Sequence, residues 1–250
     1  EIPYEIPEEE LPPLPANFDR IPFPEARVVL DHRSNNEANK NGWPELQWRY
    51  YLWSYLRHVE KVDAEVGRLL RTLDALGLRE NTVVVFTSDH GEGQARHAMT
   101  RKQFFYDESA RVPLLISAPA RLERNERFNV QPVSHLDLFP TFCGLCGVEA
   151  PAELRGADLT DVLHGRSSDL GRDFIASELT PQGGNMIRAS RLKYIAYDDG
   201  VECLLDMLDD PLETINLVSD PNRQADLDRC RQWMRSWRNS LDYSPNYPPE

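Results

Sequence analysis

The sequence has 250 residues and a formal net charge of −13 at pH 7. A nucleic-acid-binding protein needs a basic face, so this charge argues against nucleic acid as a partner. Hydrophobic residues make up 40% of the chain, which is enough for a packed core, and no apolar run is long enough to span a bilayer. We therefore expect one large domain, or one domain with a small appendage, and no membrane span.

The first 24 residues contain seven of the nineteen prolines, together with three consecutive glutamates, Glu8 to Glu10. Proline has no N–H to donate and a fixed φ, so this stretch should form neither a helix nor a central strand. We predict a Pro-rich extended segment over residues 1–43 that lies on the surface of a domain, although such a segment could also dock on another protein. We also expect further chain to precede it.

The next segments predict an α/β layer. Residues 44–76 carry apolar side chains at helical spacing, with Pro44 suited to the first turn and Gly77 to the stop. The Val-rich run 82–87 does not alternate, which indicates a strand buried on both faces, as in a parallel sheet flanked by helices. Residues 113–116 read as a second buried strand, so we predict a mixed or parallel sheet flanked by helices in a domain over residues 44–171.

The C-terminal part of the chain has a different pattern. Three short strands separated by turn residues are predicted, and Asp220-Pro221 should cap a helix with an apolar face that includes Leu227 and Cys230. This pattern predicts a small α+β subdomain over residues 172–250, with antiparallel strands and one helix. The strands are expected at residues 174–177, 186–189 and 193–197.

Four cysteines are too few for a disulfide scaffold in a chain of this length. Cys143 and Cys146 have the spacing of a redox or zinc pair, but a second pair with matching spacing is missing. Their surroundings, residues 136–148, read as a short apolar helix. We therefore interpret both as core thiols.

Asp89 and His90 directly follow the strand predicted at residues 82–87, and ligands of α/β sheets bind beyond the carboxyl ends of strands. A carboxylate oxygen and an imidazole nitrogen can share one divalent cation if the backbone turns sharply, a turn that Gly91 would permit. The alternative interpretation is that Asp89 caps a turn and His90 is an ordinary surface residue.

Two further residues near this motif suit an anionic substrate. Lys102 is placed to neutralise a tetrahedral anion held by the metal. His97 could hydrogen-bond the same anion or protonate a leaving oxygen. Both are therefore candidate catalytic and substrate-binding residues.

The longer string around these residues resembles the sulfatase family of the alkaline phosphatase superfamily. The resemblance is carried by Asp89-His-Gly-Glu and by the run from Lys102-Gln-Phe-Phe-Tyr106 to Arg111-Val-Pro113. It extends back to the helix before the strand and forward through residues 133–141 and 209–217. It thus covers most of residues 44–220 and implies an alkaline-phosphatase-like fold.

By this resemblance, Asp89 and His90 look like two ligands of the single active-site metal, which is usually Ca²⁺ in sulfatases. Many family members have Asn where this chain has His90, and an imidazole would also suit Mn²⁺ or Zn²⁺. Lys102 looks like the lysine that contacts the sulfate group, and His97 falls where family members often have a histidine near the substrate. The implied substrate is a sulfated small molecule or carbohydrate, and family members are often exported.

The nucleophile of the family lies in the pattern Cys/Ser-x-Pro-Ser-Arg, whose first residue is oxidised to formylglycine. The near match from Ser117 to Arg121 has Ala120 in place of the second serine and stands at the end of a predicted strand, so we interpret it as a chance match. We therefore expect this chain to be the C-terminal portion of a sulfatase. Its partner would be the N-terminal half, which carries the formylglycine and the other metal ligands, and the chain alone should not turn over substrate.

Two alternatives remain. One is a phosphonate monoester or phosphodiester hydrolase of the same superfamily, which shares the Asp-His pair and a lysine at similar spacing. The run from Tyr106 to Pro113 favours a sulfatase over this alternative. The other is a non-catalytic module that keeps the fold and has lost the chemistry.

Overall fold

The structure is a computed structural model that describes residues 6–20, 26–122, 131–179 and 183–241. Part of the predicted Pro-rich segment, residues 1–5 and 21–25, lies outside the described residues. The chain divides into two compact units. The first comprises residues 1–21 and 27–125, and the second comprises residues 22–26 and 126–250, so the boundary predicted between residues 171 and 172 falls inside the second unit.

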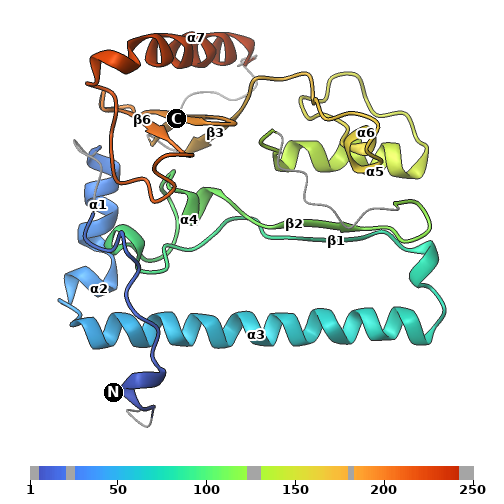
Figure 1. The fold of residues 1–250 in the computed structure, drawn as a ribbon, viewed down its shortest axis with the longest axis horizontal. Coiled ribbons are helices and arrows are strands. Elements are labelled where there is room, and N and C mark those ends of the chain that lie inside the picture. The colour runs from blue at the N-terminus through green and yellow to red at the C-terminus, as the bar shows by residue number, and fades with distance from the viewer. Residues whose placement is uncertain (1–5, 21–25, 123–130, 180–182, 242–250) are drawn as a thin grey trace, which may run out of the picture. The chain divides into compact units, whose positions relative to one another are not determined.

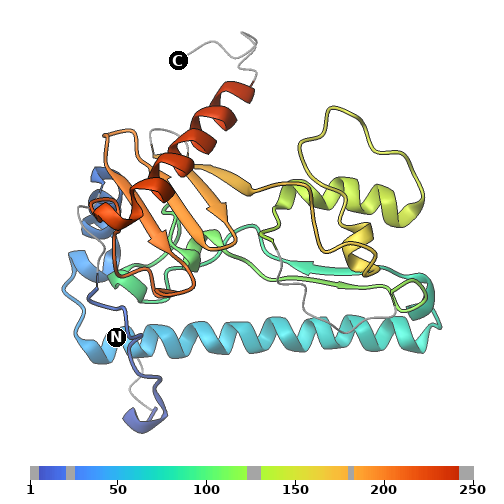
Figure 2. The same ribbon diagram turned by 45° about the horizontal axis from the view of Figure 1, so that its top comes forward.

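The first unit is built along a long helix, α3 (Glu45–Ala75), which runs beside the strands β1 and β2 in both views (Figures 1 and 2). As the sequence predicts, Pro44 precedes the first turn of α3, and Gly77, with a left-handed φ of +65°, follows the end of the helix. Trp48 near its start is buried. Farther along, several of its apolar side chains are exposed, among them Leu56, Val59, Val62 and Leu69.

The N-terminal segment lies against the start of α3. The guanidinium of Arg49 donates to the backbone oxygens of Pro12, Leu11 and Glu8 at 2.9–3.0 Å, and Phe18 meets the ring of Trp48 edge-on. The prediction that residues 1–43 are extended is wrong for part of this range. Two helices, α1 (Arg27–Asn35) and α2 (Glu37–Lys40), form there because the prolines end at position 24 and Asn36 caps α2.

β1 (Val84–Thr87) and β2 (Leu114–Ser117) form an antiparallel pair in which Thr87 lies opposite Leu114. The predicted α/β class is confirmed by the similarity to solved structures described below, but these two strands do not run parallel. The connection between them leaves and returns at the same end of the pair, which dictates an antiparallel pairing. All four residues of β1 are half-buried, so the β-branched run does not reflect burial on both faces here.

Each unit also contains short helical segments between its longer elements. In the first unit these are the 3₁₀ turns η1 (Glu8–Glu10), η2 (Arg79–Asn81) and η3 (Arg96–Ala98) and the helix α4 (Asp107–Ala110). In the second unit they are η4 (His135–Asp137), α5 (Leu138–Cys146), α6 (Thr160–Leu163) and η5 (Pro221–Arg223).

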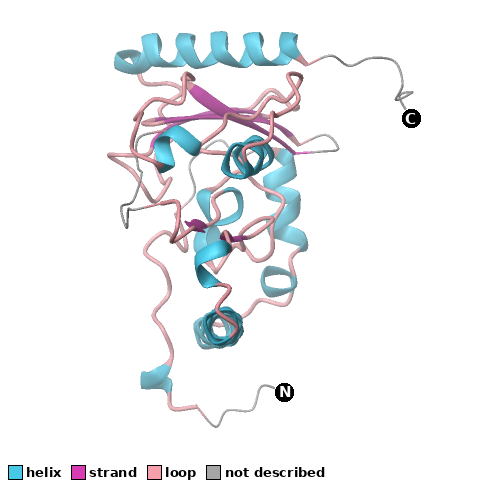
Figure 3. Cartoon of the chain, turned by 90° about the vertical axis from the view of Figure 1, so that its right-hand side faces the viewer, coloured by secondary structure: helices cyan, strands magenta, loops and turns pink. Residues whose placement is uncertain are grey.

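The second unit contains a four-stranded antiparallel sheet in the order β3-β4-β5-β6, which confirms the predicted C-terminal ribbon. Its strands are β3 (Phe174–Leu179), β4 (Gly184–Ala189), β5 (Leu192–Ala196) and β6 (Glu202–Asp206), the last of which the sequence pattern did not reveal. The predicted helix is α7 (Gln224–Ser240), which lies along one face of this sheet (Figure 3). Its Leu227, Cys230 and Met234 pack on the sheet residues Ile187, Leu192, Tyr194 and Leu204.

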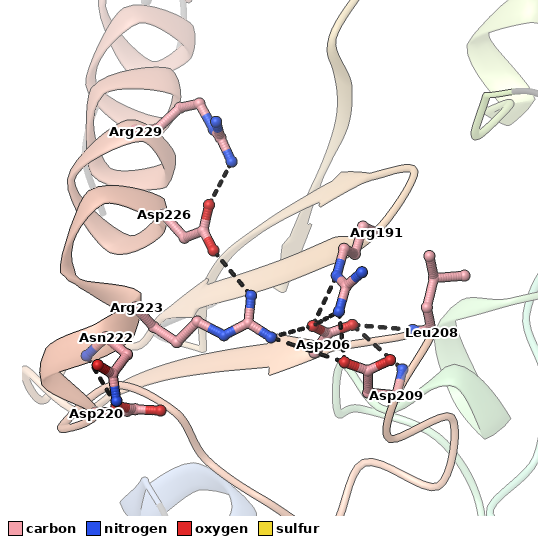
Figure 4. Close-up of polar contacts among 9 residues, drawn as sticks. All are labelled: Arg191, Asp206, Leu208, Asp209, Asp220, Asn222, Arg223, Asp226 and Arg229. Carbon is pink, nitrogen blue, oxygen red and sulfur yellow. Dashed lines mark hydrogen bonds and ion pairs between the residues drawn. The ribbon is translucent and has the colours of Figure 1, made fainter.

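A network of ion pairs connects the end of β6 to the start of α7 (Figure 4). Asp206, which is almost fully buried, accepts from the guanidinium groups of both Arg191 and Arg223. Arg223 also pairs with Asp226 at 3.1 Å, and Asp226 in turn accepts from Arg229. The polar network therefore ties the end of β6 to the first turn of α7.

All four cysteines are free thiols. Cys203 and Cys230 are buried, Cys143 is half-buried, and Cys146 is exposed at the end of α5. The prediction of a core thiol is therefore wrong for Cys146, because the helix that carries it turns this position to solvent. None of the helices in the described residues combines the length and the apolar character needed to cross a membrane.

Candidate active site

The segment after β1 makes a tight turn that brings two side chains together. The hydroxyl of Ser88 donates to the backbone oxygen of His90 at 2.8 Å, and the backbone N–H of His90 donates to Asp89 Oδ1 at 2.9 Å. As a result, Asp89 Oδ2 lies 3.2 Å from His90 Nε2. The adjacent carboxylate and imidazole thus point to one place, as sharing a cation requires.

Gly91 makes this turn possible by its size. A Cβ at this position would lie 1.8 Å from the backbone oxygen of Glu108, because the segment 108–109 passes directly beside the loop. The backbone N–H groups of Gly91 and Glu92 donate to the oxygens of Ser109 and Glu108, each at 2.8 Å. Gly91 does not have a positive φ, so close approach of two backbones, and not a left-handed turn, is the reason for glycine here.

Lys102 completes the group. Its Nζ lies 2.5 Å from His90 Nε2, and His90 Nδ1 lies 2.8 Å from the oxygen of Gly91. Because that carbonyl oxygen can only accept, Nδ1 carries the ring proton and Nε2 presents a lone pair, which accepts from the ammonium of Lys102. The hydrogen bond at Nδ1 therefore fixes the orientation of the ring, with Nε2 directed toward Asp89 and Lys102.

The donor set fits a divalent cation. The side chain of Asp89 is 80% exposed, and the hydrogen bond from the backbone N–H of His90 lowers the pKa of its carboxyl group, which stays ionised at neutral pH. Asp89 Oδ2 and His90 Nε2 lie 3.2 Å apart, so each would offer one ligand atom to the same cation. Throughout the described parts of the chain, no group of three or more His, Cys, Asp or Glu side chains gathers as a metal site. Asp89 and His90 would thus supply only part of a coordination sphere.

His97 is placed differently from the other three predicted residues. Its side chain is fully buried and stacks on the ring of Tyr106, with centroids 4.1 Å apart. Nδ1 lies 2.6 Å from the backbone oxygen of Arg20, and Nε2 lies 3.2 Å from Nδ2 of Asn17. The structure therefore brings Asp89, His90 and Lys102 together and places the ring of His97 in the interior of the same unit.

The loop that carries Lys102 has an unusual backbone that the sequence gives no sign of. Six of its residues between 94 and 103 have φ between 51° and 86° although none of them is glycine. Each such residue costs roughly 1 kcal/mol or more, so the loop must be held by its surroundings. The residues with this backbone are Gln94, Ala95, His97, Ala98, Arg101 and Gln103.

Several residues that support this loop are missed by sequence reasoning. Glu92 accepts from the hydroxyl of Tyr51 and from the backbone N–H of Arg101, which ties the loop to α3. Burial and the neighbouring Glu92 carboxylate raise the pKa of Tyr51, so its hydroxyl stays protonated as a donor. The motif itself does contain Glu92, but its partners are forty-one and nine residues away and follow no spacing rule.

The near match to the formylglycine pattern lies away from this site. Ser117 is the last residue of β2 and pairs with Val84, the first residue of β1, whereas Asp89 follows the other end of β1. Its hydroxyl accepts from Arg79 at 3.3 Å. The geometry thus agrees with the interpretation of this string as a chance match.

Comparison with known families decides the class of this protein. The Sulfatase family model matches residues 15–148, and the model described as N-sulphoglucosamine sulphohydrolase, C-terminal, matches residues 95–240. The chain belongs to the sulfatase family. The first match contains Asp89, His90 and Lys102, and the second continues from the loop of Lys102 through α7.

Individual relatives agree with this assignment. A Delta 4,5-hexuronate-2-O-sulfatase from Bacteroides thetaiotaomicron is 35% identical over 232 residues, which is 84% of this chain and 46% of that protein. A solved 2-O GAG sulfatase superposes with a TM-score of 0.82 at 29% identity and covers 96% of this chain and 57% of the other. A phosphonate monoester hydrolase from Agrobacterium radiobacter is also similar, with a TM-score of 0.69 at 26% identity over 79% of this chain and 43% of the other.

The comparisons give two further facts about this chain. It spans less than half of the length of the curated relative that it matches. Membership in the family implies a divalent metal ion, which is typically Ca²⁺ in sulfatases.

Proposed function

We propose that this chain is the part of a sulfatase that supplies one wall of the active site, and that the complete protein hydrolyses sulfate esters. The observation that carries the proposal is the group of Asp89, His90 and Lys102 at the end of β1. Asp89 and His90 would hold the metal, which polarises the sulfate group when bound. Lys102 would donate its ammonium protons to a sulfate oxygen and stabilise the charge that develops there.

The present contact of Lys102 supports this proposed role. Its ammonium now lies on the lone pair of His90 Nε2. If His90 held a metal, the ammonium of Lys102 would no longer pair with Nε2 and would have its protons available for a substrate anion. Lys102 thus lies beside the proposed metal ligands Asp89 and His90, where one sulfate group could contact both its ammonium and a metal held there.

For the metal we propose Ca²⁺, with Mn²⁺ or Zn²⁺ as alternatives, because an oxygen and a nitrogen donor suit all three. The remaining ligands and the formylglycine nucleophile would come from the N-terminal portion of the same enzyme. The exposed apolar side chains along α3 offer that portion a surface to pack on, since a helix that buried nothing there would leave them in water. They include Val59, Val62 and Leu69.

The proposed substrate class is a sulfated carbohydrate. This rests on the names of the relatives, a hexuronate-2-O-sulfatase and a 2-O GAG sulfatase. A phosphonate monoester or phosphodiester is the second candidate, supported by the similarity to the phosphonate monoester hydrolase. The higher TM-score and coverage of the sulfatase favour the sulfate ester.

The test compares ester classes on the complete enzyme, that is, this chain together with its N-terminal portion. We expect kcat/KM for sulfate esters to exceed kcat/KM for phosphonate monoesters and phosphodiesters that have the same leaving group. The reverse order by several powers of ten would contradict a sulfatase and support the second candidate.

Variants then test the residues. Lys102→Ala should lower kcat/KM by about 10²–10³-fold while Ca²⁺ still binds, because only the charge on the sulfate oxygen is lost. Asp89→Ala should weaken Ca²⁺ binding to the metal-stripped enzyme in a calorimetric titration, and activity should fall with it. Asp228→Ala, an exposed carboxylate on α7, is the control and should change neither. Unchanged turnover in Asp89→Ala would refute the metal assignment, whereas no turnover by the complete native enzyme would favour a module without catalytic chemistry.

A further inference from the structure

The loop before Lys102 is held in a left-handed backbone by residues from two distant segments. Gln, Ala, His and Arg rarely adopt positive φ, and a conformation of this kind persists only where neighbouring contacts over-determine it. Arg101 and Gln103, directly before and after Lys102, have φ of 67° and 86°. The direction in which the Lys102 side chain leaves the backbone therefore depends on the contacts that hold this loop.

One set of contacts comes from α1 and α2 and reaches the carbonyl oxygens of the loop. Arg33 Nε donates to the oxygen of His97 at 3.0 Å, and Asn39 Nδ2 donates to the oxygen of Ala98 at 2.9 Å. His32 Nε2 lies 3.0 Å from the oxygen of Thr100. Side chains of α1 and α2 therefore donate hydrogen bonds to the backbone oxygens of the loop, which the left-handed backbone turns away from its own chain.

The second set of contacts centres on His97. Its backbone N–H donates to the oxygen of Asn17 at 3.0 Å, and its Nδ1–H donates to the oxygen of Arg20 at 2.6 Å. Asn17 Nδ2 bridges to the ring at Nε2 and to Glu108 Oε1, at 3.2 and 3.3 Å. One face of the ring lies on Tyr106, so the side chain joins the N-terminal segment, the loop and the start of α4.

These contacts use the whole imidazole. Nδ1 donates to a backbone oxygen, Nε2 accepts from an amide, and the side chain has no exposed surface. A general acid must instead lie within hydrogen-bond reach of the reacting group. The expectation from the sequence that His97 contacts substrate therefore has no support in its surroundings.

We propose that His97 is a positioning residue: it anchors the left-handed loop to Asn17 and Arg20 and thereby aims Lys102, without contact to the substrate. The inference rests on the proposed function, because Lys102 is taken as the group that binds sulfate. The same reasoning predicts that Asn39, which donates to the backbone oxygen of Ala98 in this loop, also affects the rate.

The first experiment separates positioning from acid catalysis in the complete enzyme. His97→Asn keeps a donor where Nδ1 lies and tolerates φ of 52°, but it cannot deliver a proton to a leaving oxygen. We expect His97→Asn to retain kcat within a few-fold of the native enzyme and His97→Ala to lose about 10²-fold, the effect of a displacement of about 1 Å at a catalytic group.

The leaving group supplies an independent readout. If His97 only positions Lys102, the loss in His97→Ala is the same for sulfate esters with good and with poor leaving groups, and the shape of the pH–rate profile is unchanged. If it is a general acid, the loss grows as the leaving group becomes more basic, and His97→Asn is as slow as His97→Ala. Either of the latter two results would overturn the proposal.

A third measurement does not depend on catalysis. Hydrogen exchange of the amides of residues 93–103 should become faster in His97→Ala and in Asn39→Ala, and should stay slow in Asn41→Ala, whose amide contacts Glu37 at the surface. An unchanged exchange rate in His97→Ala would refute the anchoring role. If the enzyme does not hydrolyse sulfate esters but exchange still rises, the proposed function fails and the anchoring role stands.

Discussion

Lys193 Nζ lies 2.6 Å from Glu213 Oε1, and these side chains are 0% and 1% exposed. Lys193 belongs to β5, and Glu213 belongs to the segment after β6, where its φ is 56°. The segment is part of the run 209–217 that carries the resemblance to sulfatases. Glu213 thus forms an ion pair in the interior of the second unit, where a buried charge needs an oppositely charged partner.

Removal of one partner should therefore be costly. Lys193→Met leaves a buried carboxylate without its cation, and we expect it to lower the free energy of unfolding by about 3–5 kcal/mol in urea titrations of the complete enzyme. Arg166→Met, which breaks an exposed pair with Asp161, is the matched control and should cost about 1 kcal/mol or less. Equal effects of the two substitutions would contradict a dependence on burial.

The second unit should lose stability in acid. The hydrogen bond from Arg231 lowers the pKa of Glu202; for Asp206, burial raises the pKa, but the bonds from Arg191 and from two backbone N–H groups outweigh it, and the net shift is downward. A carboxyl whose pKa is lower in the folded state stabilises the fold above its unfolded value near 4 and loses this contribution as the pH falls through the folded value.

The melting temperature should accordingly fall below about pH 4. In Arg231→Met the pKa of Glu202 returns toward its ordinary value, so this variant is less stable at pH 7 and its stability declines less between pH 5 and pH 3. Parallel curves for the native and variant proteins would show that this pair does not set the acid sensitivity.

Thiol reactivity should separate the four cysteines. Burial raises the pKa of the Cys230 thiol to about 12, so almost no thiolate is present at pH 8, whereas Cys146 is exposed. We expect a thiol reagent to label Cys146 first and to spare Cys203 and Cys230 until the protein is unfolded, as peptide mass spectrometry would show. Labelling of Cys230 in the native protein at the rate of Cys146 would contradict the packing of α7.

Gly91→Ala should damage the site through its backbone. The added methyl group would meet the oxygen of Glu108, and the loop must move, which we expect to cost about 1–3 kcal/mol and to weaken metal binding at Asp89 and His90. Gly42→Ala is the control, because nothing lies within 4 Å of its added Cβ and only its φ of +61° is unfavourable. Thermal unfolding and Ca²⁺ titration of both variants test this, and unaffected metal binding in Gly91→Ala would argue against it.

The elements whose signals are local can be predicted from the sequence alone. The start and end of α3, the strands β1 and β2, most of the C-terminal ribbon and the apolar face of α7 follow from periodicity, capping and turn residues. The sequence also singled out Asp89 and His90, since adjacency in the chain and the end of a strand are visible in one dimension. Lys102 is a candidate on sequence grounds because an anionic substrate needs a positive charge beside it.

Tertiary structure alone decided the rest, because the contacts involved join residues far apart in the chain. The antiparallel pairing of β1 and β2 depends on the path of the loop between them, and the need for glycine at position 91 depends on the backbone of Glu108. His97 and Lys102 are five residues apart and looked alike as candidates. The ring of His97 is buried against Asn17 and Tyr106, whereas the side chain of Lys102 reaches His90. Only the packing of the folded chain can distinguish two polar residues in this way.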